Sequence, residues 1–434
     1  MPSILQINVT ANWGSTGKIA EQIGQTTMRN GWDSYIANGR MMNPSKSLLI
    51  KVGSQIDVYS HYAVGKVLDA EGLLSKRATK QLVKTMEEIN PDVVHLHNIH
   101  DHYLNYPVLF RYLAARDIPV VWTQHDVWAA TGGCCYTPQD CSKWKNGCNH
   151  CPQKRGLGID RSQHNYKLKK DLFTAVKSLT IVPVSEWLGD MLAESFLNKN
   201  DIRAIHNGID IDTFKPSNEN VAAKYNTGNK KIVLGVASEW SERKGLKDII
   251  KLATLLPKEE FAIIVIGKVL DGSGSVSGDG CQMVFVDRTQ NAKELAALYS
   301  AALVYINPTY QDNYPTTNLE TMACGAPVIT YYTGGSPEAV TSDTGWVIGQ
   351  GEVGRMSEII RKLGQNEKSA ILTQRASCRK RAEMEFDKDK CFEKYTSLYD
   401  ALLVNRCGYK WLIHSWLHCA GSLSAACEQR RVAA

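Results

Sequence analysis

The sequence predicts an α/β protein built from two doubly wound, Rossmann-like domains. Short apolar runs rich in β-branched residues alternate with amphipathic helical patterns, and this alternation occurs once in each half of the chain. Such runs are typical of parallel strands that helices cover on both faces. With 434 residues, 43% of them hydrophobic and 22% charged, the chain has the length of two or three domains and a composition that excludes disorder.

The first half contains five short runs that predict strands. They cover residues 4–9, 34–37, 92–98, 119–126 and 179–185. The segment "GLLSKRATKQLVKTMEEIN", residues 72–90, has the apolar spacing of an amphipathic helix. We therefore expect the first domain to span residues 1–185.

The second half repeats the alternation with six strand-like runs. They cover residues 231–238, 261–268, 282–287, 303–309, 326–332 and 345–349. We assign residues 186–404 to the second domain and leave residues 405–434 as a tail of unknown role. In sheets of this kind ligands bind at the carboxyl ends of the strands, and here we expect them between the domains.

The N-terminus and the distribution of charge indicate where the protein is located and what kinds of partner it could bind. The N-terminus has no basic region or cleavage site, and no run of 18 uncharged apolar residues occurs, so we expect a cytoplasmic protein. The net charge is +6, and residues 154–177 carry seven basic and two acidic side chains. This stretch suits lipid headgroups or nucleic acid, or is a solvated helix face.

Five cysteines fall within one short segment, "CCYTPQDCSKWKNGCNHC", residues 134–151. In a cytosolic chain such a cluster indicates metal ligands more often than disulfides. Either of the first two cysteines can complete a set of four thiolates, and the C-x-x-C pair is a usual zinc-chelating unit. The sequence predicts a structural zinc held by Cys134, Cys141, Cys148 and Cys151, with two disulfides or free thiols as the alternative.

A glycine loop, "NVTANWGSTGKIAEQIG", follows the first strand. It resembles a triphosphate-binding loop, but Asn12 replaces the first glycine of G-x-x-x-x-G-K-[ST] and Ile19 replaces the hydroxyl residue. A P-loop kinase or NTPase is therefore disfavoured. The loop is either a tight strand-to-helix turn or an anion site at the start of a helix.

A histidine-rich stretch, "HLHNIHDHYLN", also suggests a metal site. Its spacing does not match the H-x-H-x-D-H pattern of metal-dependent hydrolases, because Ile99 stands in place of the aspartate. We expect one of its histidines to pack in the core. His97 and Asn98, at the strand end, are candidates for lining the cleft expected between the domains.

The segment 307–338 contains residues suited to a nucleotide. Pro315 is followed by residues that would open a helix, and free N–H groups there suit a diphosphate. Glu320, one turn into that helix, suits a hydrogen bond to ribose hydroxyls. Lys244 and Gly245 lie at the start of another helix, after the strand 231–238.

These motifs together resemble those of the retaining GT-B glycosyltransferases of the family-four type. The resemblance covers roughly residues 1–400 and includes "HNGID…FKP", "RKGL", "ELAALYSAA" and an acid-x7-Glu segment that ends in "ACGAPVI". It is strongest to members that act in capsule, exopolysaccharide and colanic-acid synthesis. It implies a GT-B fold, in which two Rossmann-like domains face a central cleft.

The resemblance implies that the second domain holds a nucleotide-diphosphate sugar. Lys244 would neutralise the diphosphate, Glu320 would hold the ribose, and Asp312 would contact the donor sugar. The further donor-binding positions are Arg243 and the helix-opening backbone at Thr316, Thr317, Asn318 and Leu319.

For the first domain, the segment "WTQHDVW" matches the family's T-x-H-D motif, so His125 would lie over the transferred sugar. Gly14 and Gly17 match the glycine loop that faces the diphosphate and the acceptor. The resemblance implies retention of configuration without a required metal or cofactor. The acceptor would be a saccharide or lipid-linked saccharide at the inner face of the membrane, with peripheral contact and no nucleic-acid partner.

Two departures from the family pattern keep other functions open. Glu239 stands where the family often has an arginine that binds the diphosphate, and Arg243 is a candidate to compensate for it. Asp312 replaces a glutamate. The alternatives are therefore a catalytically inactive GT-B scaffold and a zinc-containing nucleic-acid-binding protein.

Overall fold

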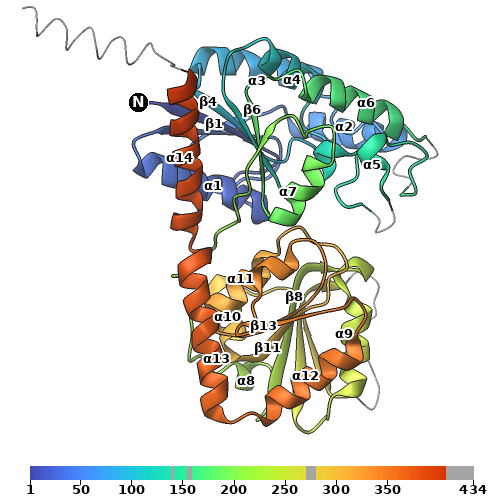
Figure 1. Cartoon of the computed structure of the whole chain (residues 1–434), viewed down its shortest axis with the longest axis vertical. Coiled ribbons are helices and arrows are strands. Elements are labelled where there is room, and N and C mark those ends of the chain that lie inside the picture. The colour runs from blue at the N-terminus through green and yellow to red at the C-terminus, as the bar shows by residue number, and fades with distance from the viewer. Residues whose placement is uncertain (138–140, 154–158, 270–279, 407–434) are drawn as a thin grey trace, which may run out of the picture.

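The computed structural model describes residues 1–137, 141–153, 159–269 and 280–406. It contains two α/β domains, each built on one parallel sheet (Figure 1). Helices lie on the faces of both sheets, so the strands are buried between them. This confirms the predicted pair of doubly wound domains.

The first domain has a seven-stranded sheet in the order β3-β2-β1-β4-β5-β6-β7. The strands are β1 (Ser3–Asn8), β2 (Asp33–Asn38), β3 (Leu48–Lys51), β4 (Val93–Leu96), β5 (Val120–Gln124), β6 (Leu179–Pro183) and β7 (Asp201–Ile202). The helices are α1 (Gly14–Arg29), α2 (Gln55–Leu68), α3 (Lys76–Ile89), α4 (Tyr106–Ala114), α5 (Lys143–Asn146), α6 (Ser162–Phe173) and α7 (Glu186–Ala193). Every residue of β4 and β5 is buried, which explains their unbroken apolar runs.

The second domain has a six-stranded sheet in the order β10-β9-β8-β11-β12-β13. Its strands are β8 (Lys231–Trp240), β9 (Phe261–Val269), β10 (Gln282–Val286), β11 (Ala302–Asn307), β12 (Val328–Tyr331) and β13 (Gly345–Ile348). The helices are α8 (Val221–Lys224), α9 (Leu246–Leu255), α10 (Ala292–Ala301), α11 (Thr316–Ala323), α12 (Val353–Gln365), α13 (Lys368–Arg381) and α14 (Lys388–Arg406). These six strands are the six that the sequence predicts.

Strand order changes direction once in each sheet. In the first sheet β1 pairs with both β2 and β4, so Ile4 lies between Ser34 and Val93. In the second, β8 pairs in the same way with β9 and β11. At such switch points the loops after neighbouring strands diverge and leave room for a ligand.

The chain divides differently from the expected boundary at residue 185. α7 and β7 follow that boundary, yet β7 pairs with β6 in the first sheet. α14 then returns from the second domain and packs against α1 (Figure 1). The tail predicted at 405–434 begins within α14, and its residues 407–434 lie outside the described part of the chain.

Helix α14 completes the core of the first domain. The buried Phe392 packs with apolar residues of the first sheet. The Tyr399 hydroxyl lies 2.7 Å from His95 Nδ1, and the Tyr395 hydroxyl lies 2.9 Å from Thr123 Oγ1. Both sheet residues are buried, so α14 satisfies polar groups that have no access to water.

Helix α2 exposes apolar side chains. Ile56 is 78% exposed and Tyr59 is 71% exposed, whereas only His61 and Gly65 of this helix are buried. Within the described residues, no helix combines the length and apolar character needed to cross a membrane.

We expect Tyr399→Phe to reduce the free energy of unfolding by about 1–3 kcal/mol, because it leaves the buried His95 Nδ1 without its partner. Urea unfolding followed by circular dichroism measures this. Tyr59→Phe, which removes the hydroxyl of an exposed tyrosine, is the control and should leave stability unchanged. Equal stability of both variants would contradict the role assigned to this hydrogen bond.

Candidate functional site

Two cavities lie between the domains, at the carboxyl ends of both sheets. The larger has a volume of about 580 Å³. Its lining includes Val127, Tyr136, Trp187, Tyr310, Asp312 and Tyr332. The smaller has a volume of about 340 Å³ and lies between α1 and α11, with Lys18 on one side and Glu320 on the other.

The two domains contact each other directly at the larger cavity. Asn313 Nδ2 donates to the carbonyl oxygen of His125 at 2.7 Å, and Gln311 Nε2 donates to that of Thr137 at 2.8 Å. The loop after β11 is therefore held against loops of the first domain. These contacts place the loop that carries Asp312 beside the segment that carries His125.

Lys244 and Asp312 form an ion pair in this cleft. Lys244 ends a 3₁₀ turn, Glu242–Lys244, that follows β8, and Asp312 lies in the loop after β11. Lys244 Nζ lies 2.6 Å from Asp312 Oδ2, and the two side chains are 21% and 15% exposed. The acid thus fixes the position of the ammonium group. The sequence analysis gives these residues separate roles, Lys244 at the diphosphate and Asp312 at the donor sugar, and does not predict their ion pair.

Arg243, a predicted donor-binding residue, contacts both domains. Its Nη1 donates to the carbonyl oxygen of Gln311 at 2.8 Å, and its guanidinium lies 4.5 Å from the centre of the Tyr136 ring. The side chain therefore links the second domain to the first by a cation–π contact. In this arrangement it does not offset the charge of Glu239, which is exposed at the end of β8.

Helix α11 presents its first turn toward the cleft. Pro315 precedes the helix and has no side-chain acceptor, so it does not cap the N–H groups of Thr316 and Thr317. Asn318 is buried, and its Oδ1 accepts from Asn307 Nδ2 at 2.9 Å. Leu319 is fully buried, and its backbone is covered as well as its side chain.

Glu320 lies one turn into α11 and lines the smaller cavity. Its Oε2 accepts from the Tyr299 hydroxyl at 3.2 Å. Burial raises the pKa of Glu320 to about 7, against the opposing effects of Tyr299 and Lys18. This carboxyl group therefore changes charge near neutral pH.

The glycine loop faces Glu320 from the first domain. Gly14 starts α1 with φ +64°, and a Cβ on Gly17 would lie 2.6 Å from Thr10 Oγ1. Both positions thus have a conformational or steric need for glycine. Lys18, in the same turn, lines the smaller cavity with Glu320.

His125 follows β5, is partly exposed, and ends a chain of hydrogen-bonded side chains that leads to the buried His97 and Gln6. Its Nε2 lies 3.2 Å from His97 Nδ1, and His97 Nε2 lies 3.0 Å from Gln6 Oε1. The Gln6 amide nitrogen donates to the carbonyl oxygen of Ala20, so Gln6 Oε1 must accept from His97. His97 Nδ1 then accepts, and His125 Nε2 is the donor.

The other nitrogen of His125 is consequently unprotonated when the ring is neutral. Burial is the main cause that lowers the pKa of His125 to about 4, and the Asp126 carboxylate opposes this shift. Among the described residues, His125 Nδ1 has no hydrogen-bond partner. Gln6, which sets this tautomer, gives no signal in the sequence because it lies inside a strand pattern.

The predicted zinc ligands are only partly gathered. Cys134 Sγ lies 4.0 Å from Cys151 Sγ, close to the separation of two thiolates on one tetrahedral zinc. Cys148 Sγ instead accepts from the N–H of Gly132 at 3.2 Å. Within the described residues, which include all four cysteines, no three of these sulfurs lie within 4.8 Å of one another. Zinc at these four cysteines stays a prediction.

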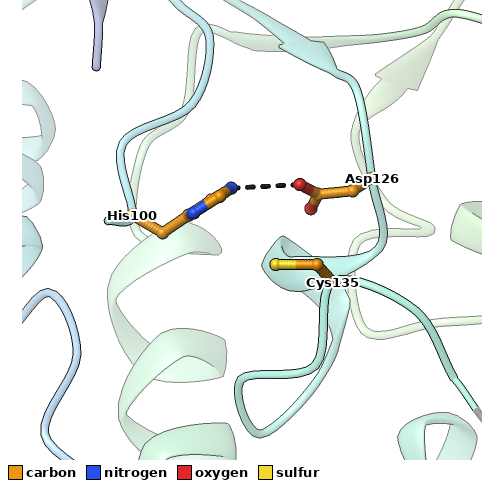
Figure 2. Close-up of side chains that lie close together, drawn as sticks. All are labelled: His100, Asp126 and Cys135. Carbon is orange, nitrogen blue, oxygen red and sulfur yellow. Dashed lines mark hydrogen bonds and ion pairs between the residues drawn. The ribbon is translucent and has the colours of Figure 1, made fainter. Parts of the chain in front are cut away.

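A different group of metal-ligating side chains lies close together behind the cleft. His100, Asp126 and Cys135 each place one ligand atom within 4.8 Å of the other two (Figure 2). His100 Nε2 lies 3.0 Å from Asp126 Oδ2. Burial alone would lower the pKa of His100, but Asp126 and then Glu71 raise it to about 9. Sequence spacing did not reveal this group, since its members come from three segments.

The chain matches two protein families. The model of Glycosyltransferase Family 4 matches residues 21–213, and that of Glycosyl transferases group 1 matches residues 217–384. WcaC of Escherichia coli K12, named as a glycosyl transferase of colanic acid biosynthesis, is 23% identical over 420 residues, which are 92% of this chain and 100% of the relative.

Solved structures show the same fold. Sucrose-phosphate synthase from Thermosynechococcus elongatus matches with a TM-score of 0.68 at 16% identity, over 93% of this chain and 100% of that one. Anabaena HepE in complex with UDP matches with a TM-score of 0.64 at 14% identity, over 92% and 100% of the two chains. Other structures of HepE contain UDP with glucose or UDP-glucose.

Neither alternative from the sequence, the inactive scaffold or the nucleic-acid-binding protein, gains support from these families. Both family matches, placed in succession, agree with the two domains of the structure. The chain therefore belongs to the GT-B glycosyltransferases, with a family 4 domain followed by a group 1 domain.

Proposed function

We propose that this protein transfers a sugar from a nucleoside-diphosphate sugar to a saccharide or lipid-linked saccharide, with retention of configuration, in cell-surface polysaccharide synthesis. The observation that carries the proposal is the Lys244–Asp312 ion pair at 2.6 Å, beside the larger interdomain cavity that Asp312 lines, while Glu320 lines the smaller interdomain cavity. UDP and UDP-glucose in HepE support a nucleotide donor. The name of WcaC supports a polysaccharide product.

Positive groups between the domains could stabilise a diphosphate leaving group. As the bond to the anomeric carbon breaks, negative charge grows on the leaving group. Lys244 and the uncapped N–H groups at the start of α11 would stabilise that charge without reorganising. A lysine and backbone donors suffice for this, so we propose that transfer needs no metal. The Glu320 carboxylate would accept from the ribose hydroxyls.

The first domain supplies groups for the sugar and the acceptor. His125 Nδ1 can accept from a hydroxyl of the transferred sugar, since Nε2 is engaged with His97. The larger cavity contains the aromatic rings of Trp187 and Tyr332, which are 38% and 75% exposed. Exposed rings of this kind suit the apolar faces of an acceptor saccharide, which would attack on the face from which the diphosphate leaves.

Replacing Lys244 tests this proposal. We expect Lys244→Ala to lower sugar transfer or donor hydrolysis by about 10²–10³-fold, because one charge-stabilising donor is lost. Lys247→Ala, which removes an exposed lysine paired with Glu242, is the matched control and should retain activity. Product formation from UDP-, GDP-, ADP- and dTDP-sugars, each with EDTA and with Mg²⁺, measures both the donor and the metal requirement.

The proposal fails if Lys244→Ala keeps control activity. An inactive scaffold would bind a nucleoside diphosphate without turnover of any donor. A thermal-shift series with the four diphosphates separates these cases, because a ligand at 100 times its dissociation constant stabilises by about 2.7 kcal/mol.

Glu320 predicts a pH dependence of nucleotide binding. The raised pKa of about 7 means that this group is mostly protonated at pH 6 and ionised at pH 8. Ribose hydroxyls donate to the ionised form, so affinity for the favoured diphosphate should rise by up to about tenfold per pH unit below 7 and level off above it. Calorimetric titration from pH 6 to 8 measures this.

Glu320→Gln is the control for nucleotide binding, since ionisation of the nucleotide itself affects both proteins equally.

The raised pKa of Glu320 also affects stability. Because burial disfavours the ionised form of Glu320, the free energy of unfolding of the wild type falls as pH rises from the ordinary carboxyl pKa toward 7. The variant should therefore gain stability relative to wild type over that interval. Parallel pH profiles for the two proteins would contradict the assignment of Glu320.

We also propose that α2 contacts the inner face of the cell membrane. Its exposed Ile56, Tyr59 and Val67 would enter the headgroup region, while Lys66 of the same helix attracts anionic lipids. Ile56→Asp combined with Tyr59→Asp should abolish co-sedimentation with anionic phosphatidylglycerol vesicles. Leu372→Asp, at an exposed apolar position of the second domain, is the control. Equal sedimentation of both variants would contradict this surface.

A further inference from the structure

We propose that His100, Asp126 and Cys135 form a binding site for a zinc-type divalent ion. A histidine nitrogen, a carboxylate oxygen and the thiol sulfur lie within 4.8 Å of one another (Figure 2). The three residues come from the loop after β4, the loop after β5 and the cysteine-rich segment. The site does not depend on the proposed transfer reaction.

The ligands are held before any ion arrives. Asp126 Oδ1 accepts from the N–H of Trp128 at 2.8 Å, which directs Oδ2 toward His100. The N–H of Val127 donates to the carbonyl oxygen of Cys135 at 3.3 Å. The side chains of His100 and Asp126 are each only 13% exposed. Ordering these groups therefore adds little to the cost of binding an ion.

A second carboxylate lies on the far side of the histidine ring. Glu71 Oε1 lies 3.7 Å from His100 Nδ1 and accepts from the N–H of Asp101 at 3.0 Å. An acid at this position favours the tautomer with hydrogen on Nδ1 and leaves Nε2 to bind a metal. Carboxylate, histidine and metal are commonly arranged in this way around zinc.

The donor set favours zinc over magnesium or calcium. Thiolate, imidazole and carboxylate together suit zinc, whereas the other two ions prefer oxygen ligands alone. Zinc bonds of about 2.0–2.3 Å place ligand atoms roughly 3.3–3.6 Å apart, so atoms that lie within 4.8 Å of one another need to approach by about 1.5 Å at most. Binding would displace the thiol proton and a proton of the imidazole. Three protein ligands leave the fourth position for water.

This site differs from the zinc predicted for the neighbouring cysteines. Cys134 Sγ approaches Cys151, whereas Cys135 Sγ approaches His100 and Asp126. The two adjacent cysteines thus contribute to different groups. Val127 and Tyr136, which adjoin two of the ligands, line the larger cavity. An ion here would join three loops behind the acceptor side of the cleft.

Zinc analysis of the full-length protein tests the proposal. The protein is stripped with a chelator, reloaded with zinc, dialysed and analysed for zinc per chain by mass spectrometry. We expect Cys135→Ser and Asp126→Asn each to lose one zinc per chain. Cys281→Ser, at a buried cysteine of the second domain, should retain the wild-type amount. Glu71→Gln should keep the stoichiometry but bind about 10–100-fold more weakly.

Cobalt substitution gives a spectroscopic readout, because Co²⁺ bound to a thiolate has a charge-transfer band. We expect a band in wild type that Cys148→Ser keeps and Cys135→Ser loses. The proposal is overturned if wild type binds no zinc, or if all bound zinc depends on Cys148 and none on Cys135 or Asp126. Circular dichroism of each variant shows whether it folds. If Cys135→Ser does not fold, the proposal is tested by the cobalt band that we expect in both wild type and Cys148→Ser.

Discussion

Parallel pairing is the constraint on which the rest of this structure depends. All strands of a parallel sheet end at the same edge, so each domain has one edge where its loops gather. The two domains turn these edges toward each other, and loops that are far apart in sequence meet there. Lys244 from the end of β8 thus meets Asp312 from the end of β11, opposite His125 from the end of β5. The chemistry of the cleft is a consequence of strand direction.

A buried set of rings connects this cleft to the outer helix α14. Tyr399 bonds to His95, whose ring centre lies 4.1 Å from that of His97, and His97 bonds to His125. Gln6 fixes the direction of the last hydrogen bond. Three histidines of this stretch, His95, His97 and His102, are buried, where the sequence predicts one in the core. The position of His97 just after the strand lets it orient a side chain at the cleft.

Local sequence patterns were sufficient to predict the alternating strands and helices that build both domains. The strands with long buried runs were predicted, as were the placements of Lys244, Asp312 and Glu320 after strands or within the first turns of helices. The edge strands β3 and β7 were missed, because they are short and mostly not buried. The group of His100, Asp126 and Cys135 was missed because folding alone brings three separate segments together. The contact between Arg243 and Tyr136 was missed because Tyr136 belongs to the other domain.

The return of α14 has a consequence for synthesis of the chain. Phe392, Tyr395 and Tyr399 belong to the core of the first domain, but they leave the ribosome after the whole second sheet. Until then, His95 and its apolar neighbours lack their cover. The first domain can therefore reach its final packing only after the second has been made, so a nascent chain that stops before residue 390 presents an unfinished core to chaperones and proteases.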